Sequence, residues 1–108
     1  MTIGIARVTL FLGGSHSLKD KRMVLRRLKD LVRGKFNAAI AEVGDNDLWQ
    51  RASLGLTVVG NDRRFTESAL DELLRFVREH ADVAKEEREL QSFGGEDLQG
   101  PDFNHWGG

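Results

Sequence analysis

The sequence contains no cysteine, and it has no apolar run long enough to span a bilayer. The first absence excludes disulfide bonds and thiolate metal sites, and it agrees with a reducing cytoplasm. The N-terminal stretch MTIGIARVTLFLGG alternates in polarity and carries Arg7, so we do not expect it to act as a signal peptide. The 108 residues suffice for one small domain with a single core. We therefore expect a small cytoplasmic protein with no membrane association.

Several motifs of nucleotide, metal and catalytic chemistry are also missing. The sequence has neither GxxxxGK[ST] nor GxGxxG, and it has no DxDxDG calcium loop. It also lacks a glycine-framed nucleophile, metal-spaced histidines and usefully spaced carboxylate pairs. We expect no cofactor, and we favour a binding module over an enzyme. The enzyme alternative would use His16 as a base beside a serine. The polar candidates for catalysis are Ser15, His16, Ser17, Glu42, Asp45 and Asp47.

Charge is distributed unevenly along the chain. The net charge is −1, but residues 1–35 contain nine basic and two acidic side chains. Residues 82–108 contain two basic and seven acidic ones. Such an asymmetry predicts a dipolar surface, which can steer a charged partner or pair two copies of the protein.

Residues 15–33 predict one amphipathic helix. Its expected buried side consists of Leu18, Val24, Leu25, Leu28, Leu31 and Val32. Four cations at positions i, i+4, i+7 and i+11 predict a ridge along another side, namely Arg22, Arg26, Lys29 and Arg33. Like charges at such spacing oppose helix formation by about 0.2–0.5 kcal/mol per pair, which favours an anionic partner such as nucleic acid. The alternative is an ordinary solvated face that acids elsewhere neutralise.

The entry to this helix predicts a cap and a second place for an anion. Ser17 and Asp20 have the spacing of a capping box, in which each side chain bonds to the backbone of the other residue. A Gly-rich loop before a helix can hold an anion, although the alternative is that Gly13 and Gly14 only make the turn. The predicted anion-binding or nucleic-acid-binding residues are His16, Ser17, Lys19, Lys21, Arg22, Arg26, Lys29 and Arg33.

The remaining periodicities predict four strands and a second helix. The strands are expected at 2–12, 36–43, 48–59 and 82–93, and the helix at 63–80, with Asp62 or Thr66 as its N-cap. The side of this helix expected to pack consists of Phe65, Ala69, Leu70, Leu73, Leu74, Phe76 and Val77. The last strand is strongly polar, as suits a sheet edge. The order β-α-β-β-α-β predicts an α+β, ferredoxin-like sandwich, a four-stranded mainly antiparallel sheet with two helices on one face. This domain covers 1–94, and a Gly-rich tail follows over 95–108, where Phe103, His105 and Trp106 could dock.

The other face of this sheet would be uncovered. It would carry Ile3, Ile5, Arg7, Thr9, Phe11, Arg51, Ser53 and Thr57. Because the face is partly apolar, we expect a homodimer, with Trp49, Arg51 and Phe11 as interaction residues. The alternative for Trp49 is that it packs in its own core. The third predicted strand has no aromatic residue on the open face, so RNA bases are not expected to stack on the sheet.

Three ordered motifs resemble the YlxP-like family, the domain of unknown function 503. They are GxHSLKDKR at 14–22, FNxxxAEV at 36–43 and DxDLWQRASLG at 45–55. The resemblance covers about residues 2–93. It implies a ferredoxin-like fold in a small bacterial cytoplasmic protein, often encoded near genes for translation initiation and ribosome maturation. It thereby implies a role near the ribosome or structured RNA, and it assigns no catalytic residues.

Overall fold

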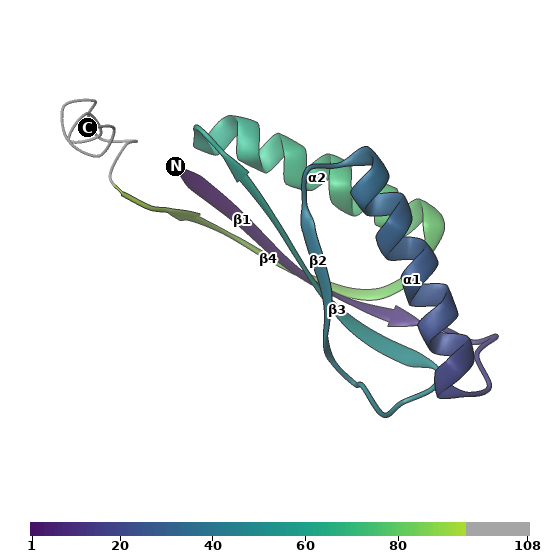
Figure 1. The fold of residues 1–108 in the computed structure, drawn as a ribbon. Coiled ribbons are helices and arrows are strands. Elements are labelled where there is room, and N and C mark those ends of the chain that lie inside the picture. The colour runs from purple at the N-terminus through teal and green to yellow at the C-terminus, as the bar shows by residue number, and fades with distance from the viewer. Residues whose placement is uncertain (95–108) are drawn as a thin grey trace.

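A computed structural model describes residues 1–94 as a four-stranded sheet and two helices, which confirms the predicted ferredoxin-like fold (Figure 1). The predicted tail at 95–108, with Phe103, His105 and Trp106, lies outside the described residues. The elements are β1 (Thr2–Phe11), α1 (Leu18–Lys35), β2 (Ala39–Gly44), β3 (Arg51–Gly60), α2 (Arg63–His80) and β4 (Asp82–Ser92). None of the helices in this part of the chain is both long and apolar enough to cross a membrane.

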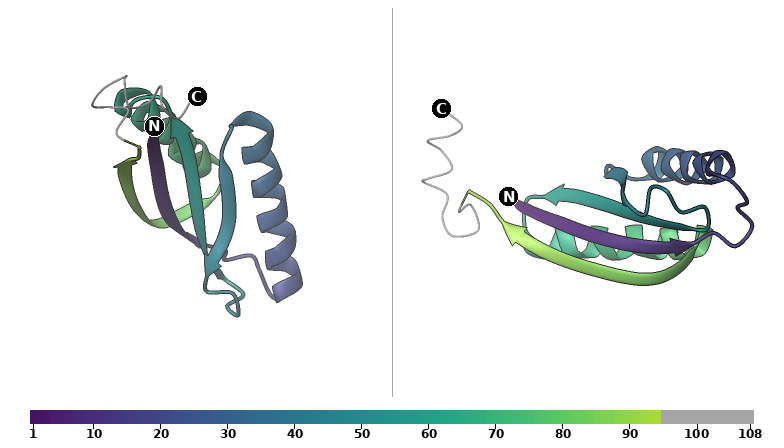
Figure 2. Two further views of the ribbon diagram at one scale, coloured as in Figure 1. Left: turned by 60° about the vertical axis from the view of Figure 1, so that its left-hand side comes forward. Right: turned by 90° about the horizontal axis from the view of Figure 1, so that it is seen from below.

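The strands lie in the order β2-β3-β1-β4, and every neighbouring pair is antiparallel. The polar β4 is therefore an edge strand, as predicted, and β2 forms the other edge. Helix α1 runs beside β2, whereas α2 packs against the other three strands (Figures 1 and 2). Helix α1 therefore lies along the β2 edge of the sheet, and α1 and β2 face each other there.

One core fills the space between the sheet and the helices. Alternate residues of β1 and β3 are buried, including Val8, Leu10 and Leu54, because a pleated strand sends successive side chains to opposite faces. Leu25, Leu28 and Val32 enter this core from α1. Helix α2 contributes a wider face, with five apolar residues buried: Leu70, Leu73, Leu74, Phe76 and Val77.

Three residues predicted to be buried in the helices are instead exposed. Val24 is 46% exposed and Leu31 is 39% exposed, because α1 lies over the margin of the sheet and buries only a narrow stripe. Both side chains line a groove of about 270 Å³ that also includes His80 near the end of α2. Phe65 is exposed in the first turn of α2. The prediction for these three positions was therefore wrong.

Two strands begin later than predicted. The N–H of Phe36 donates to the Val32 carbonyl at 2.8 Å, so this residue still terminates α1 and is not yet in β2. Its ring packs edge-on against Phe76, with 5.3 Å between centroids. Residues 48–50 lie in the β2–β3 loop instead of in β3.

Of the two N-cap residues that the sequence left open for α2, the structure shows Asp62, whose carboxylate accepts from the N–H of Phe65 at 2.8 Å.

Candidate functional site

The entry to α1 is capped, but the pairing differs in part from the prediction. Ser17 is the N-cap, and its hydroxyl accepts from the N–H of Asp20 at 3.0 Å, as predicted. The carboxylate of Asp20 accepts from the N–H of His16, also at 3.0 Å, and does not reach back to Ser17. A carboxylate thus already occupies the positive end of the helix dipole. An external anion would meet this negative charge, so we leave the entry out of the candidate site.

Lys21 is buried in the first turns of α1, with 2% of its surface exposed. Its ammonium group donates to the carbonyls of Asp45 at 2.6 Å and Leu48 at 2.8 Å. The Glu42 carboxylate lies 2.8 Å from the same nitrogen, as an ion pair whose angles are not those of a directed hydrogen bond. The two carbonyls accept hydrogen bonds from the ammonium, and the Glu42 carboxylate balances its charge. Lys21 therefore holds α1, β2 and the β2–β3 loop together.

Sequence reasoning placed Lys21 among the anion-binding residues because of its charge. The structure instead places it where no external phosphate reaches it, so it leaves the candidate site. The signal that was missed is its spacing. Lys21 precedes Leu25, Leu28 and Val32 by four, seven and eleven residues, which puts it in the buried row of α1. A cation in an apolar row predicts a buried partner, because an unpaired buried charge is costly.

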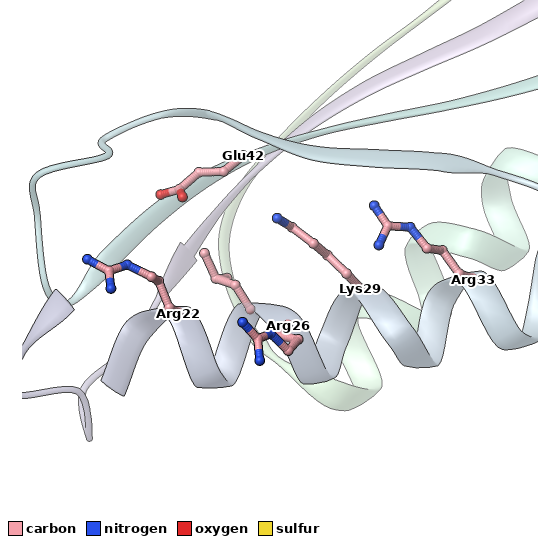
Figure 3. Close-up of a pocket in the computed structure, with 6 residues that line it drawn as sticks. Arg22, Arg26, Lys29, Arg33 and Glu42 are labelled. Carbon is pink, nitrogen blue, oxygen red and sulfur yellow. The ribbon is translucent and has the colours of Figure 1, made fainter. Parts of the chain in front are cut away.

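The predicted cationic ridge does come together, along a groove of about 320 Å³ between α1 and β2. We call this the cationic groove. Its lining consists of Arg22, Leu25, Arg26, Lys29, Arg33 and Glu42. Figure 3 shows the four basic side chains on successive turns of α1, with Glu42 facing them from β2. The span from Arg22 to Arg33 is about 16 Å, at 1.5 Å per residue.

The cationic groove carries uncompensated positive charge. Within residues 1–94, Arg22, Arg26 and Lys29 have no ion-pair partner within 4.0 Å. Arg33 donates to the carbonyl of Ile40 at 3.2 Å, which covers part of the exposed edge of β2. The Glu42 carboxylate would reduce the positive potential of the groove, but the buried ammonium of Lys21 already balances its charge. The groove is thus suited to an anion, and its length is suited to an extended one.

The other predicted anion-binding residues do not line this groove. His16 and Lys19 are exposed near the start of α1, and Ser17 serves as the cap. Of the eight predicted residues, the structure brings together Arg22, Arg26, Lys29 and Arg33.

The predicted interaction residues lie near one end of the sheet. Phe11 and Arg51 are direct partners across β1 and β3, and both are exposed. Trp49 lies two residues before Arg51 in the β2–β3 loop and is 55% exposed. The alternative that it packs in its own core is therefore wrong. Arg51 is partly neutralised, because its Nε lies 3.3 Å from the Asp45 carboxylate.

The β2–β3 loop is tied to the β1–α1 loop. The N–H of Leu12 donates to the Gln50 carbonyl at 2.8 Å. The Gln50 side-chain amide donates to the carbonyls of Gly13 at 3.2 Å and Ser15 at 3.1 Å. Asp45 has a φ of 59°, in the left-handed region that Asp tolerates better than most residues. Together with the ion pair between Lys21 and Glu42, these contacts bring all three sequence motifs together here.

The polar candidates for catalysis do not form a recognisable catalytic arrangement. Ser15 is buried and its hydroxyl has no hydrogen-bond partner among the described residues, whereas the neighbouring His16 is exposed. His80 lies at the end of α2, where its Nδ1 is 2.9 Å from the Phe76 carbonyl. Among residues 1–94, no three His, Asp or Glu side chains gather as a metal site would require.

The open face of the sheet combines apolar side chains with an ion pair. Exposed apolar residues there include Ile5, Phe11, Val43 and Val59. Arg7 on β1 bonds to Glu87 on β4, with 2.9 Å between Nη2 and the carboxylate. The pKa of Glu87 is held below its ordinary value, chiefly by the hydrogen bond from Arg7 and its charge, with a smaller contribution from Lys85.

Comparison with known proteins identifies the family. A family model described as "Protein of unknown function (DUF503)" matches residues 3–89. The chain is also 37% identical, over 83 residues, to "Uncharacterized protein YlxP" of Bacillus subtilis (strain 168). That similarity covers 77% of this chain and 90% of the relative. The protein therefore belongs to the DUF503 family and is similar to YlxP.

Proposed function

We propose that this protein is a cytoplasmic, non-catalytic module that binds RNA, at or near the ribosome, through the cationic groove. The observation that carries the proposal is the row of Arg22, Arg26 and Lys29, which have no ion-pair partner within residues 1–94 although they line one groove. Folding places these like charges together at a cost in helix stability. Phosphates of an RNA backbone would offset that repulsion, and their neutralisation by Arg and Lys would release counterions condensed on the RNA.

Contact through phosphates also agrees with the remainder of the surface. The open face of β3 presents Arg51, Ser53, Gly55, Thr57 and Val59, so it offers no aromatic ring to a base. Backbone contacts fix the position of an RNA but carry little sequence information. We therefore expect recognition that depends on charge and shape.

Fluorescence polarisation of a labelled RNA hairpin, measured over a range of salt concentrations, tests the proposal. Four phosphate contacts predict that log K falls against log [salt] with a slope of about −2.8, on the single-strand scale. Affinity should then fall about 50-fold between 50 and 200 mM salt. Absence of binding at the lowest salt, or binding that salt does not weaken, would contradict RNA binding in the groove.

A second candidate function is protein–protein interaction through a homodimer. The observation that favours it is the apolar part of the open sheet face, where Val59 is 59% exposed and Phe11 is 52% exposed. These two residues lie toward opposite ends of the face, with Ile5 and Val43 between them. Exposed apolar surface on one face is typical of interaction sites. Two copies could stack these faces and remove the apolar side chains from water.

Light scattering at increasing protein concentration tests the dimer. We expect the wild-type mass to approach that of two chains, and the Val59→Lys variant to stay monomeric because a charge would be buried at the contact. The matched control is Val24→Lys, an exposed valine on α1 instead of the open face. A monomeric wild type at the highest concentration would exclude this function.

A further inference from the structure

Trp49 is a large aromatic side chain held in an exposed position between β2 and β3. It lies in the β2–β3 loop with 55% of its surface exposed. The sequence predicted it as a homodimer contact, whereas the RNA binding proposed above does not use it. A large exposed aromatic ring loses part of its hydrophobic stabilisation, so its position calls for an explanation.

The backbone on both sides of Trp49 is fixed by contacts to other elements. The carbonyl of Leu48 accepts from Lys21 at 2.8 Å. Gln50 accepts from Leu12 through its carbonyl and donates to two carbonyls of the β1–α1 loop through its side chain. An aromatic residue on such a restrained backbone loses little conformational freedom on binding. The loop thus presents the ring in a preorganised way.

The same contacts place the loop beside the groove. Lys21, which binds the Leu48 carbonyl, directly precedes Arg22, the first cation of the groove. Lys21 also contacts Glu42, which lines the groove from β2. Figure 1 shows the β2–β3 loop next to the N-terminal end of α1. A chain that follows the cations from Arg33 to Arg22 therefore arrives at the loop that carries Trp49.

We propose that Trp49 is a stacking platform for an unpaired RNA base whose neighbouring phosphates lie in the cationic groove. This inference rests on the proposed RNA binding and adds the class of RNA, a single strand or the loop of a hairpin. A charged groove beside an exposed aromatic ring is the combination that single-stranded nucleic acids require, because every base has a face that can stack. The base reader is then a loop residue, and not the sheet used by many RNA-binding domains of similar architecture.

The test uses the intrinsic fluorescence of the full-length chain. The sequence has two tryptophans, so a Trp106→Phe background leaves Trp49 as the sole reporter. This protein is titrated with an oligouridine and with an abasic oligonucleotide of equal length and charge. We expect the oligouridine to quench the fluorescence and to bind more tightly, and the abasic strand to bind without quenching, because only the former can stack on the ring.

Substitution of Trp49 separates the ring from the groove. We expect Trp49→Ala to weaken oligouridine binding about 5- to 150-fold, and Trp49→Phe to weaken it less. Binding of the abasic strand, measured by polarisation, should be unchanged by both. Phe65→Ala removes another exposed aromatic ring, in the first turn of α2, and should leave both affinities unchanged.

The outcomes distinguish this inference from the function on which it rests. Equal affinity for both strands, together with no effect of Trp49→Ala, would overturn the stacking platform while leaving phosphate binding intact. Failure of both strands to bind would overturn the proposed RNA binding as well. If Trp49→Ala weakens both strands equally, the residue shapes the groove and does not stack with a base, which also overturns the inference.

Discussion

Replacing Lys21 by methionine should lower the free energy of unfolding by about 3 kcal/mol, the largest effect on stability that we expect from any α1 surface or core cation. Methionine keeps most of the length of the side chain but leaves the carbonyls of Asp45 and Leu48 without their donor. It also leaves the Glu42 carboxylate without its counter-charge. Because 20% of the Glu42 side chain remains exposed, we expect a cost at the lower end of the range for broken buried pairs.

Urea denaturation followed by circular dichroism measures this change. The matched control is Lys19→Met, the same substitution two residues earlier in α1 at an exposed position, which should change stability by less than about 0.5 kcal/mol. Adding Glu42→Gln to Lys21→Met should recover about 1 kcal/mol, because it removes the unpaired charge. Equal stability of the Lys21→Met variant and the wild type would show that the ammonium contacts do not hold the three elements together.

Reversing three charges of the cationic groove should weaken RNA binding more than 100-fold and remove most of its salt dependence. The variant is Arg22→Glu, Arg26→Glu, Lys29→Glu, which replaces phosphate attraction by repulsion at three points. Arg33 is left in place because it donates to the carbonyl of Ile40. The variant should fold normally, because none of the three side chains has an ion-pair partner within the described residues.

A control with the same change in net charge separates the groove from the overall field of the protein. Arg63→Glu, Arg64→Glu, Arg75→Glu changes three exposed cations of α2, none of which lines the groove. Polarisation with the RNA hairpin should show an affinity within about 10-fold of wild type, since long-range charge effects are screened by salt. An equal loss of affinity in both variants would show that binding is not localised, and retained affinity in the groove variant would refute the proposal.

Much of the fold could be predicted because its elements follow simple periodicities. The alternation over residues 2–12 and the helical spacing over residues 63–80 predict elements whose observed bounds lie within a residue or two. The capping role of Ser17 could also be predicted, because it depends only on residues a few positions away in the sequence. The position of α1 at the margin of the sheet could not be predicted from the sequence, because it depends on packing between elements. Because α1 lies at this margin, the apolar residues Val24 and Leu31 remain exposed outside the core.

The candidate site, too, could be predicted only where it depends on local spacing in the sequence. The ridge from Arg22 to Arg33 follows from helical geometry alone, and the structure adds that β2 turns this ridge into one wall of a groove. The role of Lys21 depends on carbonyls of Asp45 and Leu48, which are more than twenty residues away in the sequence. Every residue has a backbone carbonyl, so the pattern of side chains does not show which carbonyls accept a hydrogen bond. The sequence therefore indicated a charged residue but not the acceptors that bury it.

The buried ammonium of Lys21 also sets the rotational phase of α1. The buried row that begins at Lys21 and the cationic row that begins at Arg22 are offset by one residue, which corresponds to about 100° around the helix axis. Apolar packing tolerates modest rolling of a helix, whereas two carbonyl acceptors and one carboxylate counter-charge around one nitrogen define a single orientation. The direction in which the arginines point is thus specified by a polar contact on the hidden side of the helix.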